Sequence, residues 1–288
     1  MLTIKKILLP VDFPIGALDI FHQAATLARH FHSEIVLLHV VTPQSLAAGV
    51  PQDTSQSTQW NLLTEIMKEA RKQQDQSLEG ELRSLTIRSM LSGGDPAWAI
   101  VNTSEEEKAD LIMMPSYGST FEEFLLGSVA AKVLSRAECP VWTGAHAEGL
   151  KVRNFAVHSI LCALDLGIRS RDVLSWAAPL AAEFGARLTL AHITASVEFW
   201  GPGGLYVNQE WKRALVDDAS QRMAKLQQET GIKGEVFIGS GDLPIGLSHA
   251  AAETKADLLV TGCYPYGTHL RTHGYAIISA VPVPILNI

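Results

Sequence analysis

The sequence predicts an α/β fold that occurs twice, as two domains that each hold a five-stranded, mainly parallel sheet with helices on both faces. The chain of 288 residues contains an internal repeat. Residues 7–12 return as 160–165 at an offset of 153, and residues 108–112 return as 255–259 at an offset of 147. In each copy, short apolar runs alternate with amphipathic segments, which is the pattern of a parallel sheet with right-handed crossovers.

The first elements follow from hydrophobic periodicity. Residues 4–11 form a short apolar run without polar alternation, which indicates a strand buried on both faces. Apolar residues at three- and four-residue spacing then predict a helix over 21–31, and a second buried strand follows over 35–41. After a stretch rich in Gln, Ser and Thr, a long helix is expected over 61–83.

The alternation continues to the end of the first half. A strand, a helix, a strand, a long helix and a short strand are predicted over 86–91, 97–108, 111–114, 121–137 and 140–143. The second half is expected to follow the same order. Its predicted differences are a glycine-rich loop at 201–204 and a last helix shorter by about one turn.

Domain boundaries and broad class follow from the repeat and the composition. The domains are expected at 1–146 and 154–288, separated by small and polar residues. A net charge of −7 argues against a nucleic-acid binder, since such domains concentrate Lys and Arg. Three cysteines are too few for a disulfide framework, and no apolar stretch approaches the ~18 residues of a membrane span. We expect a cytoplasmic protein without nucleic-acid or membrane partners.

The place of a ligand site also follows from the fold class. In such sheets, ligands bind beyond the carboxyl ends of the strands, where the strand order switches. Asp12 and Asp165 end the first predicted strand of each half, and glycine-bearing loops follow Met114 and Thr261. These segments are therefore expected to converge at one edge of each sheet.

Several segments together resemble the universal stress protein family. They are the Pro-Val-Asp ending of the first strand, the Leu-Leu-His-Val strand, the Gly-Asp-Pro turn, the Ala-Asp-Leu-Ile strand and the Leu-Leu-Gly-Ser-Val-Ala…Cys-Pro-Val ending. The resemblance covers nearly the whole chain, in tandem form. It implies a Rossmann-like (adenine nucleotide alpha hydrolase-like) fold in each half, an intramolecular pseudo-dimer joined through the last strands, and stress-response signalling or protection.

One branch of that family binds ATP. The resemblance implies that an Asp ending the first strand holds the adenosine part, and that a loop of pattern Gly-two-Gly-nine-Gly-Ser/Thr wraps the phosphates. In the first half, Pro115 replaces the first glycine, and eight residues separate Gly118 from Gly127 and Ser128. Proline removes an N–H donor, and Glu122 with Glu123 would oppose a polyphosphate.

The second half departs from the pattern differently. Gly262 keeps the first glycine and Gly274 the last, whereas Pro265 replaces the second glycine and Tyr275 the hydroxyl residue. The charges here would favour a polyphosphate, because the loop carries His269, Arg271 and His273.

The candidate site follows from strand ends and resemblance together. Asp12 and Asp165 would accept hydrogen bonds from a ribose or an adenine; the alternative is that they cap the next helix. For Gly127 and Ser128, an anion site competes with simple helix initiation. The candidate ligand-binding residues are Val11, Asp12, Val40, Met114, Gly118, Gly127, Ser128, Asp165, Ile193, Gly262, Arg271 and Gly274.

A metal site is a second hypothesis for the same edge. Cys263, His269 and His273 are zinc-type ligands on one loop, and Asp165 could supply a fourth. The alternative is an exposed polar loop.

Other features are interpreted as structural. Residues 92–95 and 239–242 are expected to form a tight turn and a helix cap in each half. His39 and His192 are expected to be core histidines in mid-strand with their hydrogen bonds satisfied, and Cys139 a packing residue.

These observations lead to two functional hypotheses. The first is a tandem universal stress protein that binds ATP or AMP with Mg, or a related ligand, at one site. The alternative is a protein-interaction scaffold that binds no nucleotide. No spacing indicates a catalytic group, so enzymatic activity would amount at most to weak nucleotide hydrolysis. A further homodimer beyond the pseudo-dimer stays open.

Overall fold

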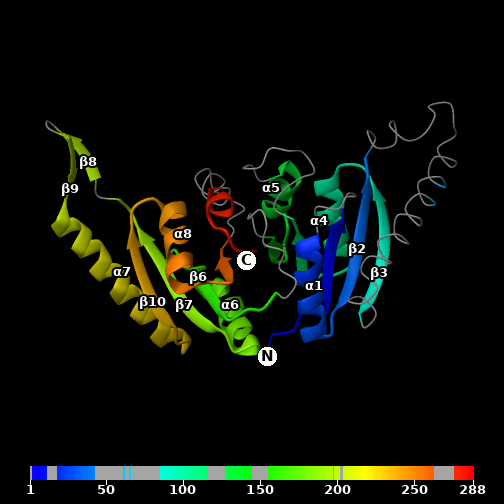
Figure 1. The fold of residues 1–288 in the computed structure, drawn as a ribbon, viewed down its shortest axis with the longest axis horizontal. Coiled ribbons are helices and arrows are strands. Elements are labelled where there is room, and N and C mark those ends of the chain that lie inside the picture. Colours follow the sequence, from blue (N-terminus) through cyan, green and yellow to red (C-terminus); the bar gives the residue numbers. More distant parts are fainter. Residues whose placement is uncertain are drawn as a thin grey trace.

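The computed structural model describes residues 2–11, 18–42, 61, 65, 85–115, 127–144, 155–196, 198–201, 204–262 and 276–288 (Figure 1). The strands are β1 (Lys6–Val11), β2 (Glu34–Val41), β3 (Thr86–Gly93), β4 (Leu111–Met114), β5 (Val141–Thr143), β6 (Ser159–Ala163), β7 (Arg187–Thr194), β8 (Glu198–Gly201), β9 (Gly204–Val207), β10 (Glu235–Ser240), β11 (Leu258–Thr261) and β12 (Ile285–Asn287). The helices are α1 (Leu18–Phe31), α4 (Pro96–Glu106), α5 (Ser128–Leu134), α6 (Ser170–Phe184), α7 (Gln209–Thr230) and α8 (Leu243–Thr254).

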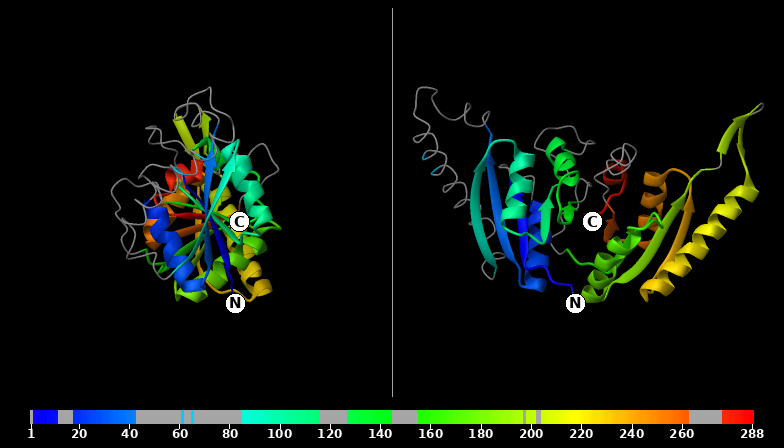
Figure 2. Two further views of the ribbon diagram at one scale, coloured as in Figure 1. Left: turned by 90° about the vertical axis from the view of Figure 1, so that its right-hand side faces the viewer. Right: turned by 180° about the vertical axis from the view of Figure 1, so that it is seen from behind.

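Ten strands form one continuous sheet in the order β10-β7-β6-β11-β12-β5-β4-β1-β2-β3. Each half contributes five strands, and all neighbours within a half are parallel. The predicted fold class is therefore confirmed. Seen along the sheet, the strands fan out through the right-handed twist that L-residues impose (Figure 2, left).

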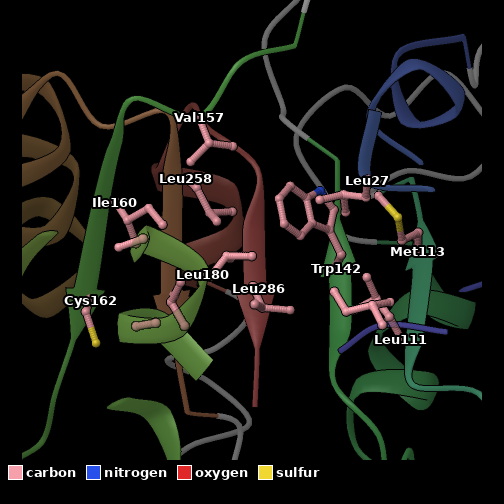
Figure 3. Close-up of a cluster of buried hydrophobic side chains, with 14 of the residues drawn as sticks. Leu27, Leu111, Met113, Trp142, Val157, Ile160, Cys162, Leu180, Leu258 and Leu286 are labelled. Carbon is pink, nitrogen blue, oxygen red and sulfur yellow. The ribbon is translucent and has the colours of Figure 1, made fainter. Parts of the chain in front are cut away.

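The two halves join through their last strands. β5 and β12 pair antiparallel, with Trp142 opposite Leu286 (Figure 3). Two side chains add hydrogen bonds across this seam: Asn287 Nδ2 donates to Val141 O at 3.3 Å, and Thr143 Oγ1 donates to Ile285 O at 3.4 Å. The expected pseudo-dimer contact is present, and β12 is short because it begins only after Pro284.

Two hydrophobic layers cover the sheet. The layer with α1, α6 and α7 runs unbroken across the seam, from Leu27 on α1 to Leu180 on α6. The opposite layer is formed by α4, α5 and α8, with Ile100 and Leu247 fully buried in it. Because both layers contain residues from each repeat, the two halves share their cores.

Two sequence predictions differ from the structure, and a third is tested at two residues alone. A continuous helix over 121–137 is wrong at Gly127, which precedes α5 with extended dihedrals (φ −55°, ψ 141°). The predicted loop at 201–204 is wrong at both ends, because Gly201 ends β8 and Gly204 begins β9, while residues 202–203 lie outside the described part. The aromatic residues around these glycines have high strand propensity. Of the predicted helix 61–83, only residues 61 and 65 are described, and both are helical.

The predicted helix caps are confirmed, but each turn is shorter than predicted, because residues 92–93 belong to β3 and residues 239–240 to β10. Gly94 and Gly241 have φ values of +114° and +125°, which only glycine adopts readily. Asp95 then accepts a hydrogen bond from Trp98 N at 3.0 Å, and Asp242 accepts one from Ile245 N at 3.1 Å. The capping N–H and Lys132 together lower the pKa of Asp95.

An ion-pair network joins the amino ends of β1, β2 and β3 in the first half, on the side of the sheet away from the helix caps. Glu107 binds Lys6 Nζ at 2.9 Å and also the guanidinium of Arg88, which reaches Glu34 Oε1 at 3.0 Å. The hydrogen bond from Arg88, followed by that from Lys6, lowers the pKa of Glu107 to about 2. The carboxylate is therefore stabilised in its charged form by folding.

This network predicts an acid-dependent loss of stability. Because the pKa of Glu107 is lowered by folding, its contribution is complete above the unfolded value of about 4.5 and is lost as the pH falls toward 2. After a discount for solvent screening, we expect Glu107→Gln to remove about 1–2 kcal/mol at pH 7 and much less at pH 3. Urea unfolding at both pH values measures the difference in the free energy of unfolding between the wild type and the variant. Glu105→Gln, an exposed neighbour, is the matched control; an equal loss at both pH values for Glu107→Gln would contradict the assignment.

Candidate functional site

The strand order switches at the same place in each half. In the second half, β6 lies between β7 and β11, and Ala163 pairs with Thr261. The chain therefore leaves the sheet at neighbouring points, through Leu164 and Asp165 after β6 and through Gly262 after β11. This is the edge where parallel sheets of this kind bind ligands.

Asp165 organises the turn between β6 and α6. Its Oδ1 accepts hydrogen bonds from Gly167 N at 2.7 Å and from Ser170 Oγ at 2.9 Å. Gly167 lies so close that an added Cβ would stand 2.9 Å from Asp165 Oδ2. The carboxyl group is exposed at the sheet edge, yet its orientation is fixed by the entry into α6.

Two further side chains hold this turn. Leu166 has a φ of +59°, a strained value for a branched residue, and its carbonyl oxygen accepts a hydrogen bond from Arg222 Nη2 of α7 at 2.8 Å. His192 Nδ1 lies 2.7 Å from Leu164 O, and since a carbonyl only accepts, Nδ1 is the donor. The predicted hydrogen bond is thus present for His192, which is nevertheless half-buried and not in the core, whereas His39 is buried as expected.

Two neighbouring residues at the end of β7 differ in their relation to the site. The Ile193 side chain packs against α8, where a Cβ on Gly246 would stand 2.9 Å from its Cδ1. Only the backbone of Ile193 is thus left to meet a ligand beyond the strand. Thr194, the last residue of β7, is buried, and its Oγ1 finds no hydrogen-bond partner among the described residues.

In the first half, two of the five described candidates are buried. Val11 ends β1 and Met114 ends β4, with 8% and 5% of their surface exposed. Val40 packs partly into the layer of α4 and α8. Gly127 caps α5 without a side-chain bond, and Ser128 is the first helical residue. These two residues do initiate a helix, as the structural alternative expects.

The remaining candidates lie outside the described residues. They are Asp12, Gly118, Arg271 and Gly274, together with the metal candidates Cys263, His269 and His273. Within the described ranges, no group of three or more His, Cys, Asp or Glu side chains is placed to hold a metal ion. In that same part of the chain, no helix is long and apolar enough to cross a membrane.

The thiols of the described part are not activated. Burial raises the pKa of Cys139 to about 11, although a hydrogen bond with Ser104 opposes the shift. Burial also raises the pKa of Cys162 far above its usual range. Both groups are protonated at neutral pH, which agrees with the prediction that Cys139 is a packing residue.

Comparison with known proteins identifies the family. The family whose model matches the chain is the universal stress protein family, over residues 3–143 and again over 156–271. The chain belongs to this family. A universal stress protein of Methanocaldococcus jannaschii is 34% identical over 140 residues, which is 48% of this chain and 79% of that protein. A second one from the same organism is 30% identical over 149 residues, covering 48% and 92%.

A solved structure supports the tandem arrangement at the level of fold. A universal stress protein from Archaeoglobus fulgidus covers 98% of this chain and 95% of its own, with a TM-score of 0.69 and 22% identity. The curated relatives each match about half of this tandem universal stress protein, whereas that structure spans both of its halves.

Three residues that support the site were not singled out from the sequence of this universal stress protein. Gly167 and Ser170, which hold Asp165, follow it at two and five residues, and such an Asp-x-Gly-x-x-Ser pattern is a readable turn signal. Arg222 had no such signal, because it binds a backbone carbonyl 56 residues away.

Proposed function

We propose that this tandem universal stress protein binds an adenine nucleotide, ATP or AMP with Mg, at the strand-order switch of its second half, and that it acts in stress-response signalling or protection. The observation that carries the proposal is the adjacency of Asp165 and Gly262. An exposed, oriented carboxylate and a glycine follow two paired strands at the edge where ligands bind.

The second half fits a nucleotide better than the first. After β11 the chain continues with Gly262, which has a backbone N–H and no side chain, and glycines of this kind permit close approach of an anion to the backbone. After β4 it continues with Pro115, which has no N–H. The following loop of the second half also carries His269, Arg271 and His273, whereas that of the first half carries Glu122 and Glu123.

Thr194 adds a second indication at the same edge. It ends β7, the strand next to β6, and its buried Oγ1 has no protein partner in the described residues. An unsatisfied buried hydroxyl costs about 1–3 kcal/mol, so such a group is usually paired with a water or a ligand.

The test is a thermal melt with and without millimolar Mg-ATP, ADP and AMP, after a check for nucleotide that co-purifies. A ligand at ~100 times its Kd stabilises the folded state by about 2.7 kcal/mol, which raises Tm by a few degrees for a chain of this size. We expect Asp165→Asn to abolish this shift. Asparagine keeps an Oδ1 acceptor for Gly167 and Ser170, so the turn into α6 is retained while the negative charge is lost.

Asp242→Asn is the matched control. It removes one negative charge from the same edge of the same half and keeps a good helix cap, so its nucleotide shift should equal that of the wild type. A shift lost in Asp12→Asn instead would assign the nucleotide to the first half. No shift with any nucleotide would refute the proposal.

That last outcome would favour the interaction scaffold. Its supporting observation is that Asp165 Oδ1 already accepts two hydrogen bonds within its own turn. Under the scaffold hypothesis, the Asp165 carboxylate only stabilises the start of α6, and the carboxyl edge of the sheet binds no nucleotide.

A further inference from the structure

The hairpin β8–β9 stands apart from the ten-stranded sheet. Glu198 pairs with Val207 and Gly201 with Gly204, and within the described residues the two strands pair only with each other. Figure 1 and the right panel of Figure 2 show the hairpin beyond the end of the sheet, next to the start of α7. A two-stranded hairpin is marginally stable in water, and at least a third strand or a packing partner is needed for independent stability.

The two strands of the hairpin differ in the features that keep an exposed edge from pairing with a further strand. Proteins protect exposed edges with charges, prolines or bulges. β8 carries Glu198, whereas β9 consists of Gly204, Leu205, Tyr206 and Val207, without a charge or a proline. β9 is therefore the edge that is open to another strand.

Two exposed apolar side chains lie on α7, the helix that follows β9 in the chain. The helix begins at Gln209, immediately after Asn208, whose side chain caps it by accepting from Trp211 N at 3.0 Å. Trp211 is 66% exposed and Leu215 38% exposed, whereas Ala219 and Met223 further along the same helix are buried on the sheet. Exposed apolar groups at neighbouring positions of a helix face are typical of an interaction site.

We propose that the edge of β9, with Trp211 and Leu215, is the interface of a homodimer in which β9 pairs antiparallel with β9 of a second copy. A two-fold axis places Leu205 opposite Tyr206 of the second copy, and Gly204 opposite its Val207, so no like charges meet. The result is a four-stranded sheet, which supplies the strands that the isolated hairpin lacks.

The charges nearby favour a second copy over a charged partner. The first turns of α7 carry both signs close together, with Glu210, Lys212, Arg213, Asp217 and Asp218. A surface with charges of both signs has no strong net electrostatic field that would attract a nucleic acid or an anionic membrane. Two copies of such a surface can approach each other without strong charge repulsion. Recognition then rests on backbone hydrogen bonds and apolar contact, as in other cases of strand addition.

We expect a Kd in the micromolar range, so sedimentation velocity between about 2 and 200 μM tests the proposal. The chain of 31.2 kDa should double in mass across this range. Leu205→Lys/Tyr206→Lys sets lysines opposite each other across the two-fold axis and should weaken the dimer at least ~10-fold. The charge-matched control is Ile168→Lys/Ile245→Lys, which changes two exposed residues of the same half and should leave the dimer intact.

Hydrogen exchange of the wild type gives a readout that does not depend on any variant. The amides of β9 should exchange more slowly at the high concentration than at the low one, while those of β10 stay unchanged. A monomer at every concentration, or equal weakening by both double variants, would overturn the proposal. The nucleotide melts described above do not depend on this interface, so either proposal can fail alone.

Discussion

Replacing Trp142 by alanine is expected to lower the free energy of unfolding by about 3–5 kcal/mol, the usual cost of deleting a large buried aromatic side chain. Trp142 is 1% exposed and lies on β5 in the middle of the ten-stranded sheet. Its ring meets the ring of Phe155 edge-on, with 5.7 Å between the ring centroids. Its Nε1 donates a hydrogen bond to the buried Gln23 Oε1 at 2.7 Å. The substitution opens a cavity at the seam and leaves the amide of Gln23 without this donor.

Two further variants separate these effects. Trp142→Phe keeps most of the ring but removes the donor to Gln23, so we expect a loss of about 1–3 kcal/mol. Trp98→Ala changes a tryptophan that is 57% exposed and should cost less than about 0.5 kcal/mol. Urea unfolding followed by circular dichroism measures all three. A loss below about 1 kcal/mol for Trp142→Ala would mean that the seam does not depend on this side chain.

Gly246→Ala is expected to destabilise the protein by about 1–3 kcal/mol through overpacking. A loss of stability would be the opposite of the usual effect, because a glycine-to-alanine change in an exposed helix stabilises the helix by about 1 kcal/mol. Here an added Cβ would lie 2.9 Å, 3.0 Å and 3.1 Å from three side-chain atoms of Ile193. Packing against β7 therefore outweighs helix propensity at this position.

The internal repeat supplies a compensating change. At the positions of Gly246 and Ile193, the first half has Ala99 and Val40, a larger helix residue with a smaller strand residue. Ile193→Val alone should cost about 0.5–1.5 kcal/mol. The double variant Gly246→Ala/Ile193→Val should recover most of the loss, with a coupling of about 1 kcal/mol or more in a thermodynamic cycle of melts. Additive losses would show that the two residues do not compete for one space.

Much of the fold could be predicted because its signals are local. Every residue of β4 is buried, so an uninterrupted apolar run marks the strand with its correct bounds. The caps at Asp95 and Asp242 could be predicted because glycine and aspartate have distinct backbone and side-chain chemistry at a helix start. The hairpin could not, since its glycines pointed to a loop while the flanking aromatic residues favoured strands.

The site could be predicted only in part, because position along a strand does not give the direction of a side chain. Asp165 was expected to end the strand and lies two residues beyond β6, and its bonds to Gly167 and Ser170 depend on the path of the turn. Ile193 lies at the right edge, and its side chain nevertheless packs on α8. Such orientations depend on tertiary contacts with helices that are remote in sequence.

The central place of β5 and β12 has a consequence for synthesis on the ribosome. β5 ends at Thr143 and β12 begins at Ile285, so at ~5–20 residues per second the edge of β5 waits roughly 7–30 s for its partner strand. During that interval, two nascent chains of one polysome expose the same uncharged strand, Val141–Thr143. β12 of the same chain therefore competes with β5 of a neighbouring chain, and slower translation would favour an exchanged, two-chain product.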